Sequence, residues 1–173
     1  ADGLLLDLGF SFWHIKESKR GFSFLKDEPL VMTYKKDGMT AEEFLNHADL
    51  ETIYKVIKNF GEERFAWRIA KKIIEFRKNK KIKTTFDLVK IIEESVPESY
   101  KHKKIHPATR TFQALRIYLN QELENLKTIL GRLDEIVKSG GRVAIISFHS
   151  LEDRIVKNYF KKMKEEKKLK ILT

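Results

Sequence analysis

Asp7, Ser147 and His149 are well placed to take part in chemistry, because they lie at the ends of two short apolar runs. The runs are Leu4-Leu5-Leu6-Asp7-Leu8 and Val143-Ala144-Ile145-Ile146-Ser147-Phe148. Such runs are typical of strands buried on both faces of a parallel sheet, and open α/β sheets bind ligands beyond the carboxyl ends of their strands. We therefore interpret Asp7 as a ligand-binding carboxylate, and Ser147 and His149 as groups that hold a phosphate or the polar edge of a base. In the alternative interpretation, Asp7 caps its own turn and Ser150 caps the following helix.

Several other kinds of site are disfavoured by what the sequence lacks. The chain has no cysteine, which excludes disulfides, thiolate zinc sites, iron–sulfur clusters and a cysteine nucleophile. It also has no G-x-S-x-G elbow, so a serine hydrolase of that type is excluded. His149, Glu152 and Asp153 have no second pair of residues at ligand spacing, and we expect no metal site there.

The charge balance favours a polyanionic partner. The chain has 35 Lys and Arg against 25 Asp and Glu, a formal net charge of +10, and basic side chains neutralise phosphates. Arg68, Lys71 and Lys72 recur with Arg64 at helical spacing, which would form a basic stripe for a nucleic-acid backbone. A solvated helix face explains the same spacing equally well.

A sheet and its connecting helices must position these residues. Strands are predicted at 4–8 and 142–148, and a third is predicted to begin at 169–172. Helices are predicted between and after these strands. A capping box at Thr40 and Glu43 and a cap at Asp49 mark the starts of two of them. The others are an amphipathic helix over 62–79, a short helix that begins at Thr85 and is closed by Pro97, one long helix over 108–139, and a final helix capped by Ser150.

These elements predict an α/β fold with a large helical insertion. The sheet domain is expected to comprise 1–15 and 107–173, and the helical insert 16–106. No apolar run reaches the roughly 18 residues of a membrane span, and no signal peptide opens the chain, so we expect a cytoplasmic protein that does not bind a membrane.

Five segments together resemble one known family. They are Asp-Gly-Leu-Leu-Leu-Asp-Leu-Gly at 2–9, Arg-Gly-Phe-Ser-Phe at 20–24, Gly-Glu-Glu-Arg-Phe-Ala at 61–66, His-Pro-Ala-Thr-Arg-Thr-Phe-Gln-Ala-Leu-Arg-Ile at 106–117 and Ile-Ser-Phe-His-Ser-Leu-Glu-Asp-Arg-Ile-Val-Lys at 146–157. The chain resembles the bacterial 16S ribosomal RNA cytosine-N4 methyltransferases, the MraW or RsmH family, from end to end.

The resemblance implies part of a Rossmann-like class I methyltransferase sheet with a helical insert. It further implies that S-adenosyl-L-methionine is the cofactor and that the substrate is a cytidine N4 amine in the decoding region of small-subunit ribosomal RNA. Asp7 and His14 would contact the cofactor, and Phe44 would lie near the cytidine pocket, where an aromatic ring can stack on a base. The cytosine amine is a poor nucleophile, so an acceptor on its N–H would help; Asp7 or a backbone carbonyl of residues 8–10 is our candidate.

The family pattern also places a glycine-rich cofactor loop and an acidic strand before residue 1, and a further segment after Thr173. We therefore expect the chain alone to bind the cofactor weakly or not at all, and to be inactive without the missing strands. An unpaired sheet edge is expected to associate with a second copy or with a complementing amino-terminal chain. A basic helical RNA-binding or interaction module without catalysis of its own is the alternative function.

Overall fold

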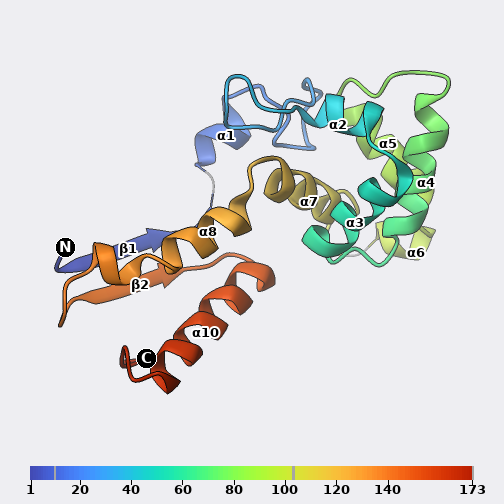
Figure 1. The fold of residues 1–173 in the computed structure, drawn as a ribbon. Helices are drawn as coiled ribbons and strands as arrows, with labels where there is room; N and C mark the ends of the chain where they lie inside the picture. The colour runs from blue at the N-terminus through green and yellow to red at the C-terminus, as the bar shows by residue number, and fades with distance from the viewer. Residues whose placement is uncertain (10, 103, 173) are drawn as a thin grey trace. The chain divides into compact units, whose positions relative to one another are not determined.

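The chain folds as two compact units, one built of helices and the other built of helices and a small parallel sheet (Figure 1). The computed structural model describes residues 1–9, 11–102 and 104–172. Its elements are β1 (Gly3–Asp7), α1 (Phe12–Lys16), α2 (Ala41–His47), α3 (Leu50–Gly61), α4 (Ala66–Arg77), α5 (Thr85–Ser95), α6 (Glu98–Lys101), α7 (Thr109–Leu119), α8 (Glu122–Leu130), α9 (Leu133–Ile136), β2 (Arg142–Ile146) and α10 (Ser150–Glu165). The sheet unit comprises Ala1–Phe10 with Gln121–Thr173, and the helical unit comprises Ser11–Asn120.

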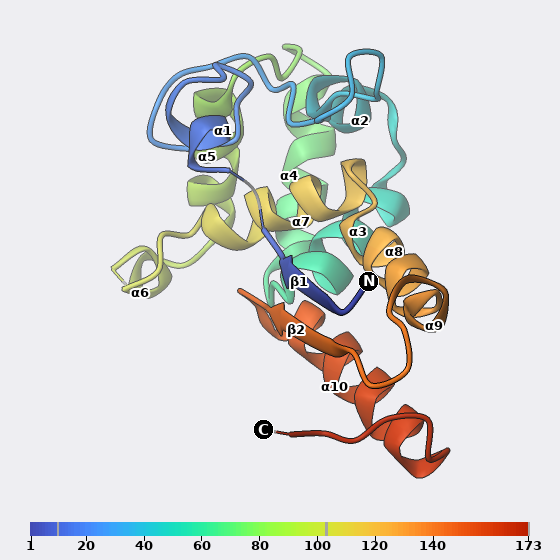
Figure 2. The ribbon, with the colours of Figure 1, turned by 90° about the vertical axis from the view of Figure 1, so that its left-hand side faces the viewer.

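The sheet unit is built on β1 and β2, which pair in parallel as neighbouring arrows in Figure 2. The register places Leu4 opposite Val143 and Asp7 opposite Ile146. Residues 169–172 lie outside any strand, so the third strand predicted there is wrong. In the described part of the chain that segment has no neighbouring strand with which to exchange hydrogen bonds, and apolar residues alone do not form a strand.

Helices cover one face of this two-stranded sheet. Leu4, Val143 and Ile145 pack with the buried leucines of α8 and α9 and with apolar side chains of α10. On the other face Leu5 is 65% exposed and Ile146 is 47% exposed. The prediction that both strands are buried on both faces is therefore wrong for the described residues, because burial alternates along each strand.

The helix predicted over 108–139 is divided into α7, α8 and α9. Gln121 has a positive φ of 53° and separates α7 from α8. Just before it, the Asn120 side chain accepts a hydrogen bond from the Tyr34 N–H at 2.7 Å and donates one to the Met32 carbonyl at 2.9 Å. These bonds hold the end of α7 on the 32–34 loop, and the two compact units divide at the same point. The compact units divide here because α7 packs on α3 while α8 packs on α10. The domain boundaries expected from the sequence stay a prediction.

Within the helical unit, α2, α3 and α5 begin where the local sequence predicts. The capping box of Thr40 and Glu43 is confirmed, as are the Asp49 cap of α3 and the start of α5 at Thr85. Within this unit α3 packs closely on α7. Its last residue is Gly61, where a Cβ atom would lie 2.5 Å from the Arg110 carbonyl oxygen. Glycine, which has no Cβ atom, therefore allows α3 and α7 to approach each other closely at this position.

The core of the helical unit is formed by apolar side chains of several helices and of the loop before α2. The largest fully buried ones are Leu30, Met32, Leu45, Ile53, Ile57, Ile69, Ile73, Ile82, Leu88, Ile91, Ile92 and Leu115. In the described part of the chain, none of the helices combines the length and the apolar character that a membrane span requires.

Candidate functional site

The carboxyl edge of the sheet carries Asp7 and the loop that follows β2. Asp7 lies opposite Ile146, and the Leu8 N–H donates a hydrogen bond to the Ile146 carbonyl at 3.0 Å. Both strands therefore end at the same edge. The Asp7 side chain is exposed and has no hydrogen bond or ion pair within the described ranges. It is available as an acceptor where open α/β sheets bind ligands. The Phe10 carbonyl, one of the acceptor candidates, lies outside the described residues.

Phe148 and Gly9 shape the same edge of the sheet. The Phe148 side chain is 67% exposed. A Cβ atom on Gly9 would lie 3.1 Å from two atoms of the Phe148 ring, and Gly9 has φ of +147°, which side-chain-bearing residues rarely adopt. Glycine at this position therefore allows the backbone after β1 to pass close to the Phe148 ring. Ser147 is half-buried beside it.

His149 caps α10 with its side chain. Its Nδ1 accepts the Glu152 N–H at 3.5 Å, and its Nε2 lies 3.2 Å from Glu152 Oε1. The other carboxylate oxygen of Glu152 accepts the Phe148 N–H at 3.0 Å. The prediction that Ser150 caps this helix is wrong, because the imidazole reaches the free N–H and Ser150 is the first helical residue. The substrate-binding roles of Ser147 and His149 stay predictions.

Glu122, His149 and Glu152 also form a cluster with potential metal-ligand atoms within 4.8 Å of one another. A metal on Nε2 would need the lone pair of that nitrogen. Because Nδ1 already accepts a backbone N–H, the proton of a neutral ring lies on Nε2, which is buried 3.2 Å from Glu152 Oε1 but makes no hydrogen bond among the described residues. The donor set thus fits helix capping better than metal ligation.

His14 lies among aromatic rings in the helical unit. The centre of its ring is 5.3 Å from that of Phe22 and 4.9 Å from that of Tyr34, and Phe22 and Tyr34 stack at 5.3 Å. His14 Nδ1 is buried and has no hydrogen-bond partner among the described residues. Its contact with a cofactor stays a prediction, as does that of Asp7, which belongs to the sheet unit.

Phe44 lies in the core of the helical unit. It is 3% exposed, and its ring centre is 5.0 Å from that of Tyr118. This arrangement leaves neither ring face open, so a base could stack on Phe44 only after the side chain moved. Stacking on a cytidine stays a prediction.

The predicted basic stripe lies on α4. Arg68 and Lys71 are exposed, whereas Lys72 forms an ion pair with Glu94 at 3.3 Å. The Arg68 guanidinium lies 5.7 Å from the centre of the Phe65 ring. Arg68 and Lys71 are thus the members of the stripe most available to a phosphate.

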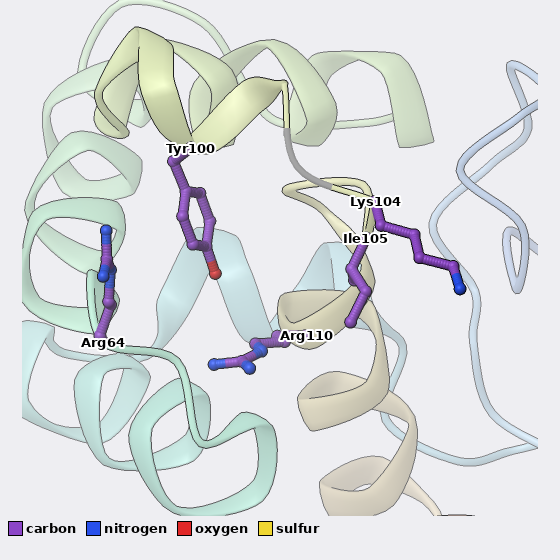
Figure 3. Close-up of a pocket in the computed structure, with 5 residues that line it drawn as sticks. All are labelled: Arg64, Tyr100, Lys104, Ile105 and Arg110. Atoms are coloured by element: carbon purple, nitrogen blue, oxygen red, sulfur yellow. The ribbon is translucent and has the colours of Figure 1, made fainter.

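The sequence did not predict a basic cavity in the helical unit. The cavity measures about 390 Å³ and is lined by Arg64, Tyr100, Lys104, Ile105 and Arg110 (Figure 3). Arg64 and Arg110 belong to two of the motifs that carry the family resemblance, at 61–66 and 106–117. The two motifs are far apart in the sequence, so nothing local could show that their arginines line one cavity.

A buried carboxylate supports one wall of this cavity. Glu63 is fully buried, and its oxygens accept hydrogen bonds from the Tyr100 hydroxyl at 2.7 Å and from the Phe65 N–H at 2.8 Å. Burial, followed by the hydrogen bond to Glu63, raises the pKa of Tyr100 to about 12. The hydroxyl therefore stays protonated and neutral at physiological pH.

Comparison with known proteins identifies the family. The MraW methylase family matches residues 1–172, and the chain belongs to this family. Membership confirms the resemblance found in the motifs and implies a class I methyltransferase fold. Proteins named "Ribosomal RNA small subunit methyltransferase H" are among its relatives.

Three of these relatives show how far the similarity extends. The protein of Buchnera aphidicola subsp. Schizaphis graminum is 54% identical over 162 residues, which cover 93% of this chain and 51% of the relative. That of Rickettsia felis is 47% identical over 165 residues, 95% of this chain and 53% of the relative. That of Hydrogenovibrio crunogenus is 48% identical over 161 residues, 92% of this chain and 51% of the relative. The chain spans about half the length of these curated relatives.

Proposed function

We propose that the chain forms part of an S-adenosylmethionine-dependent methyltransferase that modifies the N4 amine of a cytidine in the decoding region of 16S ribosomal RNA. The match of residues 1–172 to a methylase family carries this proposal. The names of the relatives, which state an action on small-subunit ribosomal RNA, support the substrate. Such a substrate would place the reaction in the cytoplasm.

The exposed Asp7 carboxylate suits the cofactor and the reaction. S-adenosylmethionine, when bound, supplies an electrophilic methyl group on a positively charged sulfur. A nearby carboxylate stabilises that charge. Asp7 can also accept an N–H of the cytosine amine, which raises the electron density on the nitrogen, and the carbonyls of Leu8 and Gly9 are the alternative acceptors. Methyl transfer then depends mainly on holding the nucleophile in line with the donor.

The RNA is proposed to lie on basic side chains. Exposed Arg68 and Lys71 would contact its phosphates, and Phe44 would stack on a base after leaving its present position. Association with a second copy or a complementing amino-terminal chain also stays a proposal, supported by the exposed apolar side chains of Leu5 and Ile146.

A chimera tests this function. The chain would replace the matching region of the Buchnera relative, and the product would be incubated with labelled S-adenosylmethionine and small ribosomal subunits. We expect N4-methylcytidine in the decoding region, identified by nuclease digestion and mass spectrometry. Methylation of a different base or position, or RNA binding without any methyl transfer, would contradict the proposal. The second outcome would favour a binding module.

Substitution of Asp7 tests its role in the same assay. Asp7→Ala removes a charged acceptor and should slow methyl transfer and weaken cofactor binding by on the order of 2 kcal/mol, about thirtyfold. The control is Asp134→Ala, which removes another exposed carboxylate of the sheet unit. Equal activity and cofactor affinity in the two variants would exclude Asp7 from the site.

A further inference from the structure

Two arginines, Arg64 and Arg110, line the cavity in the helical unit together with Tyr100. Arg64 precedes α4, Tyr100 lies in α6 and Arg110 lies in α7. In Figure 3, Arg64 and Ile105 lie on opposite sides of the Tyr100 ring, and the Arg110 side chain extends below the Tyr100 hydroxyl. The Lys104 ammonium points away from them. Arg64 and Arg110 thus define the charged part of the cavity.

The positive charge of both arginines is available to a ligand. In the part of the chain that the structure describes, neither Arg64 nor Arg110 forms an ion pair with a carboxylate. The carboxylate of Glu63 accepts hydrogen bonds from Tyr100 and Phe65 instead of pairing with either guanidinium. Arg110 uses one donor on the Glu62 carbonyl at 3.0 Å, and a guanidinium has five.

Both guanidinium groups are held in place before any ligand arrives. That of Arg64 lies 4.5 Å from the centre of the Phe65 ring and 5.1 Å from that of Tyr100, and cation–π contacts of this length favour this position. Arg110 is anchored through Glu62 and lies where α7 meets Gly61. Planar guanidinium groups bind phosphate through paired hydrogen bonds, so this preorganisation favours a phosphate.

The rest of the cavity suits the sugar or base next to a phosphate. Its volume of about 390 Å³ lies within the usual range for ligand pockets, roughly 300–1,000 Å³. Ile105 is 55% exposed and gives the cavity an apolar wall, and Lys104 stands beside it. A chain of nucleotides can therefore place one phosphate between the arginines and continue past Ile105.

We propose that this cavity binds one phosphodiester of the RNA substrate between Arg64 and Arg110, with the adjoining nucleotide against Ile105. The inference rests on the proposed function for its choice of RNA. It assigns to two of the family motifs a role in holding the substrate, and it moves Arg64 from the predicted stripe with Arg68, Lys71 and Lys72 to a cavity that it shares with Arg110.

The first test adds a negative charge at the mouth of the cavity. Binding of the 173-residue chain to a fluorescent single-stranded RNA of about 12 nucleotides would be measured by anisotropy. Ile105→Glu should weaken binding about tenfold, and Ile105→Gln should have little effect. Met39→Glu is the matched control, because Met39 is 54% exposed and receives the same charge. Equal affinity in Ile105→Glu and Met39→Glu would overturn the proposal.

The second test removes the arginines. The double variant Arg64→Gln, Arg110→Gln should lose affinity and flatten the salt dependence by about 0.7 units, since the one phosphate that both arginines bind contributes about 0.7 on single-stranded RNA. The control is Lys78→Gln, Lys81→Gln, two exposed cations that follow the other end of α4, about 18 Å away along the helix. Thermal unfolding checks that all variants are folded. Equal losses in the two double variants would overturn the proposal.

Two further outcomes distinguish the proposed RNA site from a mononucleotide site and from the proposed methyltransferase activity. If cytidine monophosphate binds with the same dependence on Arg64 and Arg110 while RNA binding does not depend on them, the cavity is a mononucleotide site and the proposal is wrong. If the chimera methylates ribosomal RNA normally with Ile105→Glu, and RNA affinity is also unchanged, the cavity proposal fails while the methyltransferase proposal stands. Loss of RNA affinity in a chimera that never methylates would support the cavity and contradict the enzyme.

Discussion

Glu63 and Tyr100 are far apart in the sequence and form a hydrogen bond. The contribution of this bond to stability depends on the burial of the carboxylate. The carboxylate is fully buried and accepts short hydrogen bonds, of 2.7 and 2.8 Å, from Tyr100 and Phe65. Removal of one partner of a buried charged group leaves its desolvation uncompensated. The pair therefore stabilises the wall on which Arg64 lies.

Tyr100→Phe should lower the free energy of unfolding by about 1–3 kcal/mol, because Glu63 loses one of its donors. Urea denaturation followed by circular dichroism measures this change. The control is Tyr54→Phe, since Tyr54 is half-buried and its hydroxyl makes no hydrogen bond within the described ranges. A loss in Tyr54→Phe as large as that in Tyr100→Phe would contradict the role of the pair.

The raised pKa of Tyr100 predicts a loss of stability at high pH. Its folded-state pKa of about 12 exceeds the usual value of about 10, so the stabilisation is fully present below about pH 10 and is lost as the pH rises toward 12. The difference in unfolding free energy between the wild-type chain and Tyr100→Phe should therefore shrink across this interval. A difference that stays constant up to pH 12 would show that the hydroxyl titrates normally.

Residues whose partners are close in sequence were the ones that could be predicted. Thr40 with Glu43, and Asp49 with Thr52, are three residues apart, so a capping pattern reveals them. The meeting of Arg64 with Arg110, or of Glu63 with Tyr100, depends on how distant helices pack. His149 was recognised as a candidate, but its capping of α10 was assigned to Ser150, since Ser is the more common cap.

At the scale of helices, close approach of α3 and α7 positions Arg110. Gly61→Ala would place a methyl group 2.5 Å from the Arg110 carbonyl oxygen and 3.2 Å from the Ala114 Cβ. The helices must move apart, and we expect a loss of about 1–3 kcal/mol of unfolding free energy together with weaker RNA binding. Denaturation and the anisotropy assay measure the two effects.

Gly131→Ala is the matched control for this prediction. A Cβ atom there would have its nearest neighbour at an ordinary 3.4 Å, and φ is −66°. This substitution should be neutral or stabilise the chain by about 0.4–1 kcal/mol, because alanine restricts the unfolded state. If both glycine variants lose equal stability, the α3–α7 contact is not the cause.

The break between α7 and α8 shows why element boundaries were harder to predict. Leu115, Leu119, Leu123 and Leu126 continue one apolar stripe through the break, so periodicity alone predicts a single helix. The break depends on Asn120, whose amide binds the backbone of Met32 and Tyr34. A partner so distant in sequence leaves no local signal.

At the scale of the whole chain, the two paired strands and the helical block between them could be predicted, whereas the third strand was wrong and the expected domain boundaries stay a prediction. The α/β pattern with a helical block follows from apolar runs and caps. Only the packing of α7 on α3 shows that this helix belongs to the compact helical unit. The exposed side chains of Leu5 and Ile146 likewise depend on which face the helices cover.

Asn120 also has a consequence for the order of folding. It is the last residue of the helical unit, and its side chain binds Tyr34, whose ring lies 4.9 Å from that of His14 near the first residue of that unit. The unit thus ties its own two ends together. Pairing of β1 with β2 joins Leu4 to Val143, and closing so long a loop slows folding unless the intervening chain is already compact. We therefore expect the helical unit to fold first.

Asn120→Ala should then slow refolding while changing the unfolding rate little, as for a residue whose contacts form before the rate-limiting step. Stopped-flow refolding and unfolding measure both rates. Faster unfolding at an unchanged refolding rate would place strand pairing first. If the expected order holds, the helical unit shortens the effective loop between the two strands, and a sheet assembled from opposite ends of the chain can form about as readily as one assembled from neighbouring segments.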